Sequence, residues 1–256
     1  MGPVPLTEVV PFDRAMRRYG NMSSYAADTF RQLIVSGHLL PGEQLYIEEI
    51  AERLHISATP VREALFRLKV EGFVDSVHRQ GFRVHPTSPE DIADVFLVHA
   101  DVAGELAARA VEIITDDQVR KLTILHYEMM AASLRGDMST LEELNNAFHR
   151  TLNLVVDAPI LHRIVALCTK YVPRHFYASI EGWPEATRSE HTEIIEALET
   201  RDAEAARHTV RDHILHSGEL LAAHFRTAIA VEGRAGGSAL DGDTDSDVDE
   251  ASAGSA

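Results

Sequence analysis

Residues 45–84 read LYIEEIAERLHISATPVREALFRLKVEGFVDSVHRQGFRV, and this stretch decides the fold of the amino-terminal region. Apolar residues recur at helical spacing on both sides of a break at 55–58, which predicts two short helices. Thr59 and Pro60 predict the start of the second helix, because a capping threonine is followed by proline at the first helical position. Gly72 predicts the end of that helix.

The rest of the stretch predicts a β-hairpin. Residues 73–77 and 81–84 alternate apolar and polar side chains, and the basic segment 78–80 lies between them. A helix with outward arginines, held by a second helix and followed by such a wing, has the geometry that enters the major groove of DNA. We therefore expect a winged helix-turn-helix domain over residues 21–86, with double-stranded DNA as its partner.

The side chains that we expect at the DNA lie on the second helix and on the wing: Ser57, Thr59, Arg62, Arg67, Arg79, Gln80 and Gly81. Arg62 lies in the first helical turn, which is the part of a recognition helix that reaches base edges, and arginine pairs there with guanine. Ser57 would donate to a phosphate or cap the helix, and the wing would follow the DNA backbone or enter the minor groove. The residues alone leave an alternative open, in which Arg62 pairs with Glu63 inside the domain.

The charge of the chain limits how it can bind DNA. The 256 residues carry a formal net charge of −16, which argues against bulk attraction to nucleic acid. The charge is uneven, because residues 25–85 hold seven Lys and Arg against eight Asp and Glu, whereas 232–256 hold one against seven. Binding must therefore rest on a few aimed side chains, which a dimer would double.

Beyond the hairpin the pattern is almost wholly helical. We expect a mostly α protein, in which the winged helix-turn-helix is followed by a six- or seven-helix antiparallel bundle over residues 87–231. Residues 1–20 resemble a flexible arm. Residues 232–256 are rich in Gly, Ser and Asp and predict a disordered acidic tail. The single cysteine, Cys168, and the lack of any run near the roughly 18 apolar residues of a membrane span predict a cytoplasmic protein.

Histidines form the second informative pattern. Asn145 and His149 are four residues apart and share one helical face, and His191 and His213 fall on the last two predicted helices. Three imidazoles with one oxygen ligand suit Zn²⁺, or Ni²⁺ or Mn²⁺ with added waters. The chain has 14 histidines, so spacing alone favours surface or hydrogen-bonded core histidines over a metal site.

Both halves of the chain resemble one family, the GntR superfamily of transcription regulators, in the branch with an FCD-type all-helical ligand-binding domain. The amino-terminal resemblance covers 24–84 and rests mainly on the segment SATPVREAL at 57–65 and on Glu71-Gly72. The carboxy-terminal resemblance covers about 90–225. It rests on the segment NNAFH that ends at His149, on Glu190-His191 and on His213.

The resemblance implies a homodimer that binds a palindromic operator and senses a small molecule, commonly an organic acid, in a pocket with a divalent metal at its floor. It implies four metal ligands: Asn145, His149, His191 and His213. For the effector pocket we expect His99, Phe148 and Arg174. We predict a repressor that this ligand releases from DNA, with activation as the open alternative because the sign of control depends on the position of the operator.

Three positions depart from the family pattern. Asn145 replaces the usual aspartate, and a neutral amide is a weaker metal ligand. Ala58 stands where the family often has an arginine that contacts DNA. His99 and Ala103 replace an arginine and a glutamate on the first bundle helix, which implies an effector of a different kind.

Two alternatives remain open from the residues. Three histidines around a metal could activate water in an enzyme. We expect no enzyme, because the sequence offers no obvious general base fixed beside the site. Glu190 and Glu193, which flank His191, are the only nearby candidates. The other alternative is a regulator whose metal site is empty or purely structural.

Overall fold

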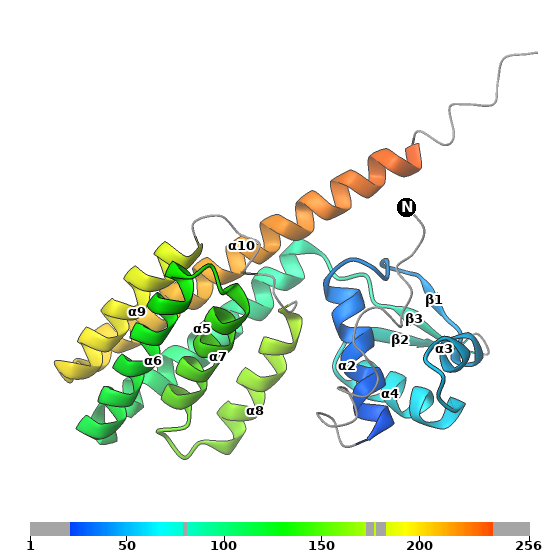
Figure 1. Ribbon diagram of the computed structural model, residues 1–256. Helices are drawn as coiled ribbons and strands as arrows, with labels where there is room; N and C mark the ends of the chain where they lie inside the picture. The colour runs from blue at the N-terminus through cyan, green and yellow to red at the C-terminus, as the bar shows by residue number, and fades with distance from the viewer. Residues whose placement is uncertain (1–20, 79–80, 173–176, 178–182, 238–256) are drawn as a thin grey trace, which may run out of the picture.

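The computed structural model describes residues 21–78, 81–172, 177 and 183–237. Within them the chain forms two domains, which lie side by side in Figure 1. A small three-stranded sheet with three helices makes up the amino-terminal domain, and a helical bundle follows it. This arrangement confirms the predicted fold class of a winged helix-turn-helix joined to a helical domain.

The amino-terminal domain contains six elements: α2 (Met22–Val35), β1 (Gln44–Leu45), α3 (Ile47–Arg53), α4 (Ala58–Val70), β2 (Val74–Val77) and β3 (Gly81–Val84). The strands are antiparallel in the order β1-β3-β2, with Leu45 opposite Phe82 and Val74 opposite Val84. Strand β1 was not predicted, because two residues are too few to show alternation. Helix α4 is the recognition helix of the predicted helix-turn-helix.

The start of α4 differs from the prediction. The capping residue is Ser57, not Thr59, and its side chain makes no capping hydrogen bond. Pro60 therefore lies in the third helical position. Proline is tolerated there because the first four N–H groups of a helix have no partner within it. The predicted end is confirmed, since Gly72 follows the capping residue Glu71 with a positive φ of +87°.

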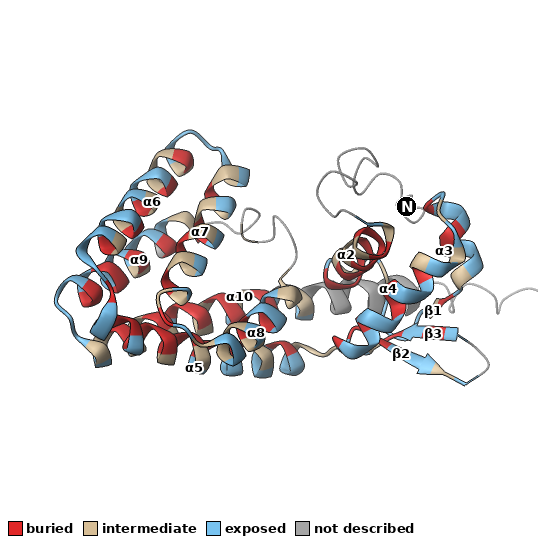
Figure 2. Cartoon of the chain, turned by 90° about the horizontal axis from the view of Figure 1, so that it is seen from below, coloured by how far each residue is buried: buried red, intermediate tan, exposed pale blue. Residues whose placement is uncertain are grey.

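One apolar core holds this domain together. Phe30, Leu65, Leu68 and Phe73 are fully buried within it. Helix α2 packs against α4, and Figure 2 shows α2 buried along most of its length, while β2 and β3 each combine buried residues with exposed ones. Because α4 buries only Val61, Ala64, Leu65 and Leu68, its opposite face is left to the solvent.

The helical domain contains seven elements: α5 (Pro89–Ile113), α6 (Asp116–Leu134), α7 (Met138–Asn153), α8 (Pro159–Cys168), the 3₁₀ turn η2 (Thr169–Tyr171), α9 (Trp183–Glu199) and α10 (Ala203–Gly237). Six α-helices thus lie in the described part of this domain, within the predicted six or seven. Reciprocal side-chain caps begin α5 at Ser88 and α6 at Thr115.

Helices α5 and α10 pack closely along one another. At Gly104 of α5 an added Cβ would lie 2.8 Å from the carbonyl oxygen of Arg207. At Gly218 of α10 it would lie 2.5 Å from Cβ of Phe96. Side chains at these two crossings would force the helices apart, so the two glycines set the position of α10 beside the cavity described below.

Helix α10 continues to Gly237, so residues 232–237 are helical, although we expected them in the disordered tail. The arm at 1–20 and the rest of the tail lie outside the described residues. Among the helices that the structure describes, none combines the length and the apolar character that crossing a membrane requires.

Candidate metal centre and DNA-binding surface

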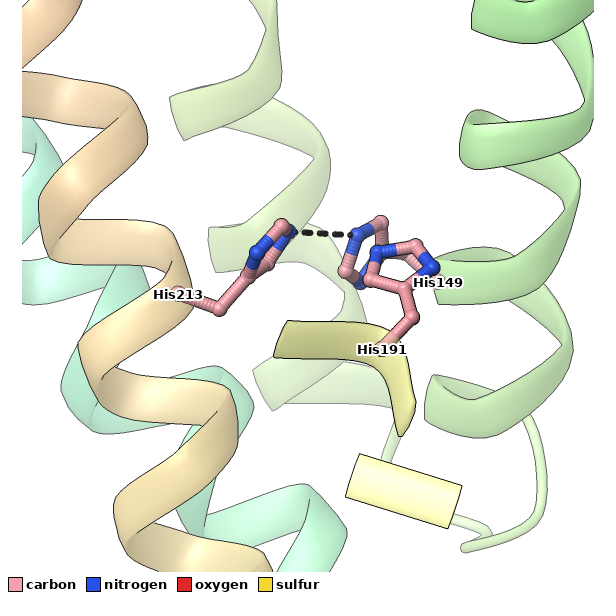
Figure 3. Close-up of side chains that lie close together, drawn as sticks. All are labelled: His149, His191 and His213. Carbon is pink, nitrogen blue, oxygen red and sulfur yellow. Dashed lines mark hydrogen bonds between the residues drawn. The ribbon is translucent and has the colours of Figure 1, made fainter. Parts of the chain in front are cut away.

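Three histidines from three helices converge inside the helical domain. Figure 3 shows the rings of His149 from α7, His191 from α9 and His213 from α10 directed toward one another. One ring nitrogen of each lies within 4.8 Å of the others, and Nε2 of His149 is 3.0 Å from Nε2 of His213. His191 is completely buried and His213 nearly so.

Several buried polar atoms at this point have no partner among the described residues. Both ring nitrogens of His191 and Oδ1 of Asn145 make no hydrogen bond there. Asn145 lies one helical turn before His149 on α7. A buried polar group without a partner costs free energy, so such groups are normally satisfied. A cation bound here would take one ring nitrogen of His191 together with Oδ1 of Asn145, and the donor set of imidazoles and one amide oxygen fits a divalent metal.

A glutamate orients one of the three rings. Nδ1 of His213 donates to Oε2 of Glu190 at 2.5 Å, and Nδ1 of His216 donates to Oε1 of the same carboxylate at 2.6 Å. Burial raises the pKa of Glu190, but the hydrogen bonds and charges of the two histidines outweigh it, and the pKa is lowered. The carboxylate is therefore ionised at neutral pH and leaves Nε2 of His213 turned toward His149.

The other two imidazoles are held neutral. Burial, with smaller contributions from neighbouring histidines, lowers the pKa of His149 and of His191 well below the usual value. Neutral imidazole is the form that binds a metal. Metal uptake at neutral pH therefore requires no removal of charge from either ring.

A cavity of about 570 Å³ opens beside the three histidines. Its polar lining includes Asn145, His149, His213, His99 and Arg150. His99 is buried, and burial, with a smaller effect of His213, lowers its pKa to about 4. Arg150 is exposed and has no hydrogen-bond or ion-pair partner among the described residues. Sequence reasoning did not find Arg150, since nothing in its local pattern separates it from a solvated arginine.

The three residues expected along the effector pocket have different positions. His99 lines the cavity. Phe148 does not, because it is fully buried in the core, where its ring stacks on His191 with centroids 4.2 Å apart. On this turn of α7 the cavity is lined by His149 and Arg150, whereas Phe148 belongs to the core cluster. Arg174 lies outside the described residues.

The residues predicted at the DNA that the structure describes are all exposed: Ser57, Thr59, Arg62, Arg67 and Gly81. Arg62 has no side-chain partner in the described part of the chain, so the alternative pair with Glu63 is not formed. Arg67 donates to Oγ of Ser24 on α2 at 3.0 Å, a contact that the sequence did not predict. Arg79 and Gln80 lie outside the described residues.

The winged helix-turn-helix joined to a helical domain defines a DNA-binding transcription regulator. The family model described as bacterial regulatory proteins, gntR family, matches residues 23–84, and the FCD domain model matches residues 94–216. The chain therefore belongs to the GntR family and carries an FCD domain. Regulators of this family bind operator DNA and typically form dimers.

Individual relatives agree with this assignment. The chain is 26% identical to the HTH-type transcriptional repressor RspR of Escherichia coli (strain K12) over 191 residues, which cover 74% of this chain and 84% of RspR. It is 30% identical over 151 residues to an uncharacterized HTH-type transcriptional regulator of Agrobacterium vitis, covering 58% of this chain and 86% of the relative. Both relatives are named as transcriptional regulators.

A solved structure shows the same fold. The structure of E. coli McbR/YncC superimposes with a TM-score of 0.61 at 24% identity, covering 80% of this chain and 99% of that chain.

Proposed function

We propose that this protein is a ligand-responsive repressor that binds a palindromic operator as a homodimer and is released by a small molecule held in the helical domain. The observation that carries the proposal is the group of buried, unpartnered metal-ligating atoms at His191 and Asn145, directly beside an open cavity. A core built only for stability would not leave such atoms unsatisfied.

The metal would be held by Asn145, His149, His191 and His213. Imidazole-rich sites of this kind favour Zn²⁺, and Ni²⁺ or Mn²⁺ would fit with additional water ligands. When bound, the ion would supply a Lewis-acidic anchor for an oxygen atom of the effector. The neutral amide of Asn145 would bind the metal more weakly than an aspartate. The second candidate is therefore a regulator whose metal site is purely structural or empty.

Two features of the cavity support a small organic acid as the effector. Its volume of about 570 Å³ lies within the range of small-molecule sites. Arg150 provides a guanidinium that has no described partner and can pair with a carboxylate. His99 is neutral at pH 7 because its pKa is lowered to about 4, so it would offer a hydrogen bond and no charge.

On the DNA side, Arg62 would contact guanine from the first part of α4. Ser57, Thr59, Arg67 and Gly81 are exposed on the same domain and would contact the backbone or base edges, together with Arg79 and Gln80 of the wing.

Metal analysis and native mass spectrometry of the freshly purified protein test this function, because they detect both a bound ion and a retained ligand. Zn²⁺ titration of the EDTA-treated protein then measures affinity. We expect His149→Ala to weaken Zn²⁺ binding and Asn145→Asp to strengthen it, whereas His208→Ala, at an exposed histidine of α10, should leave it unchanged. Absence of Zn²⁺, Ni²⁺ and Mn²⁺ binding would refute the metal site. Binding of metal with no small-molecule effect on DNA affinity would favour the structural role.

A further inference from the structure

The two domains meet at the carboxyl end of the recognition helix α4. Nζ of Lys170 donates to Oε1 of Glu71 at 2.6 Å, and the hydroxyl of Tyr171 donates to the main-chain carbonyl of Glu71 at 3.1 Å. Glu71 is the residue that caps α4. Lys170 and Tyr171 are neighbours in η2 and lie about one hundred positions after Glu71 in the chain. They thus hold the residue that caps the recognition helix α4.

Glu71 is also tied to its own domain. Arg31 of α2 donates to Oε2 of Glu71 through Nε at 3.1 Å and Nη2 at 2.6 Å. Burial raises the pKa of Glu71, but Lys170 and Arg31 outweigh this effect and lower it. The Glu71 carboxylate is almost entirely buried, so its negative charge is compensated by Arg31 and Lys170 and not by water. A small displacement of either cation would weaken this compensation.

An apolar contact accompanies these polar ones. The ring of Tyr171 packs on Phe73 with centroids 4.5 Å apart. Tyr171 is partly buried against the cores of both domains. At Gly72 an added Cβ would lie 3.0 Å from the Tyr171 hydroxyl, so glycine leaves the room that this contact needs.

The segment 169–172, which contains Lys170 and Tyr171, also contributes to the cavity wall. Thr169 and Val172 line the cavity, whereas Lys170 and Tyr171, which lie between them, contact Glu71. Residues three apart lie on one side of a 3₁₀ turn. Thr169 and Val172 can therefore face the cavity while the residues between them face Glu71. Upstream, α8 contributes His162, Val165 and Ala166 to the cavity and leads directly into this turn.

We infer that residues 169–172 are the coupling element of this regulator: occupancy of the cavity acts on Thr169 and Val172 and changes the hold of Lys170 and Tyr171 on the end of α4. The inference rests on the proposed function, in which the cavity binds the effector. Such coupling requires that the bound molecule has different affinities for the states with this contact made and broken. Lys170 and Tyr171 then act as positioning residues for the recognition helix.

Hydrogen exchange of the full-length protein tests this inference. The EDTA-treated protein is compared with protein saturated with Zn²⁺, alone and with acetate or succinate. In the wild type we expect the amides of residues 58–71 to change their exchange rate by about fivefold or more. Lys170→Ala and Tyr171→Phe should each abolish this change, and Tyr171→Phe keeps the ring packing intact. Lys170→Arg, which retains the cation, should preserve it.

Lys121→Ala provides the matched control, because Lys121 is an exposed lysine on α6, far from η2 in sequence. The Lys121→Ala variant should show the same change in hydrogen exchange at residues 58–71 as the wild type. Zn²⁺ affinity, measured separately by calorimetry, should be the same in all these variants. Failure of the wild type to bind Zn²⁺ would count against the proposed metal site. Zn²⁺ binding with no response at 58–71, or with an unaltered response in Lys170→Ala and Tyr171→Phe, would overturn the coupling inference.

Discussion

His149 and His213 face each other across the helical domain with their Nε2 atoms 3.0 Å apart. One of these nitrogens must carry a proton and the other a lone pair. Glu190 accepts the hydrogen bond from Nδ1 of His213, so the ring of His213 turns its Nε2 toward Nε2 of His149. The hydrogen bond between the two rings thus joins two nitrogens that can both bind a metal.

Glu190 should control metal affinity through this arrangement. Glu190→Gln removes the negative charge that fixes the ring of His213, so we expect Zn²⁺ to bind about tenfold more weakly or worse. Calorimetric titration of the EDTA-treated protein measures the change. Glu193→Gln, at an exposed glutamate one turn along α9, is the control and should match the wild type. Equal affinities for both variants would show that Glu190 does not orient the site.

His99 should make the metal-free protein sensitive to mild acid. Its pKa is lowered from 6.5 to about 4, so below pH 6.5 the unfolded chain binds a proton that the folded chain does not. The contribution of His99 to the free energy of unfolding is therefore fully present above pH 6.5. It falls by about 3 kcal/mol as the pH drops toward 4. Urea unfolding at several pH values should show a smaller loss for His99→Gln. The exposed control, His208→Gln, should follow the wild type, and identical profiles for all three proteins would contradict the prediction.

Arg62 should carry sequence-specific DNA affinity. Its guanidinium is exposed and has no partner in the described part of the protein, so its removal disturbs no described contact. We expect Arg62→Ala to weaken binding to an operator selected from random sequence by about 1–3 kcal/mol, with little effect on a scrambled duplex. Fluorescence anisotropy at fixed salt measures both. Arg135→Ala, at an exposed arginine of the helical domain, should change neither, and unaltered operator affinity in Arg62→Ala would remove Arg62 from the interface.

Substitutions at two glycines distinguish the cost of backbone strain from the cost of disturbing the contact between the domains. Gly72 and Gly136 both have positive φ, +87° and +70°, which costs an L residue roughly 1–2 kcal/mol. An added Cβ meets the Tyr171 hydroxyl at Gly72 but nothing within 4 Å at Gly136. Chemical denaturation should therefore find Gly72→Ala more destabilising than Gly136→Ala. A cost for Gly72→Ala no larger than for Gly136→Ala would mean that Tyr171 does not press on this turn.

Much of the fold could be predicted from local patterns. The break after Leu54, the end of α4 at Gly72 and the hairpin each depend on a few neighbouring residues. The start of α4 was predicted two residues late, because Ser57 and Thr59 are both good capping residues and only packing selects between them. The extent of α10 beyond residue 231 was missed, since its last residues lack the apolar stripe that marks a buried helix.

The candidate metal site was predictable only in part. The four-residue spacing of Asn145 and His149 places both on one helical face, but nothing local brings His191 and His213 to the same point. That convergence depends on how α7, α9 and α10 pack, including the close approach of α5 and α10 at Gly104 and Gly218. The displacement of Phe148 into the core follows from the same packing.

By itself, the sequence determined the elements, their caps, the class of DNA-binding domain and the residue types of the metal site, because these depend on interactions within a few positions of the chain. Only the tertiary structure decided that Lys170 and Tyr171 hold Glu71, and that Thr169 and Val172 face the cavity. Contacts between residues one hundred positions apart arise from the packing of whole helices, which no local pattern encodes.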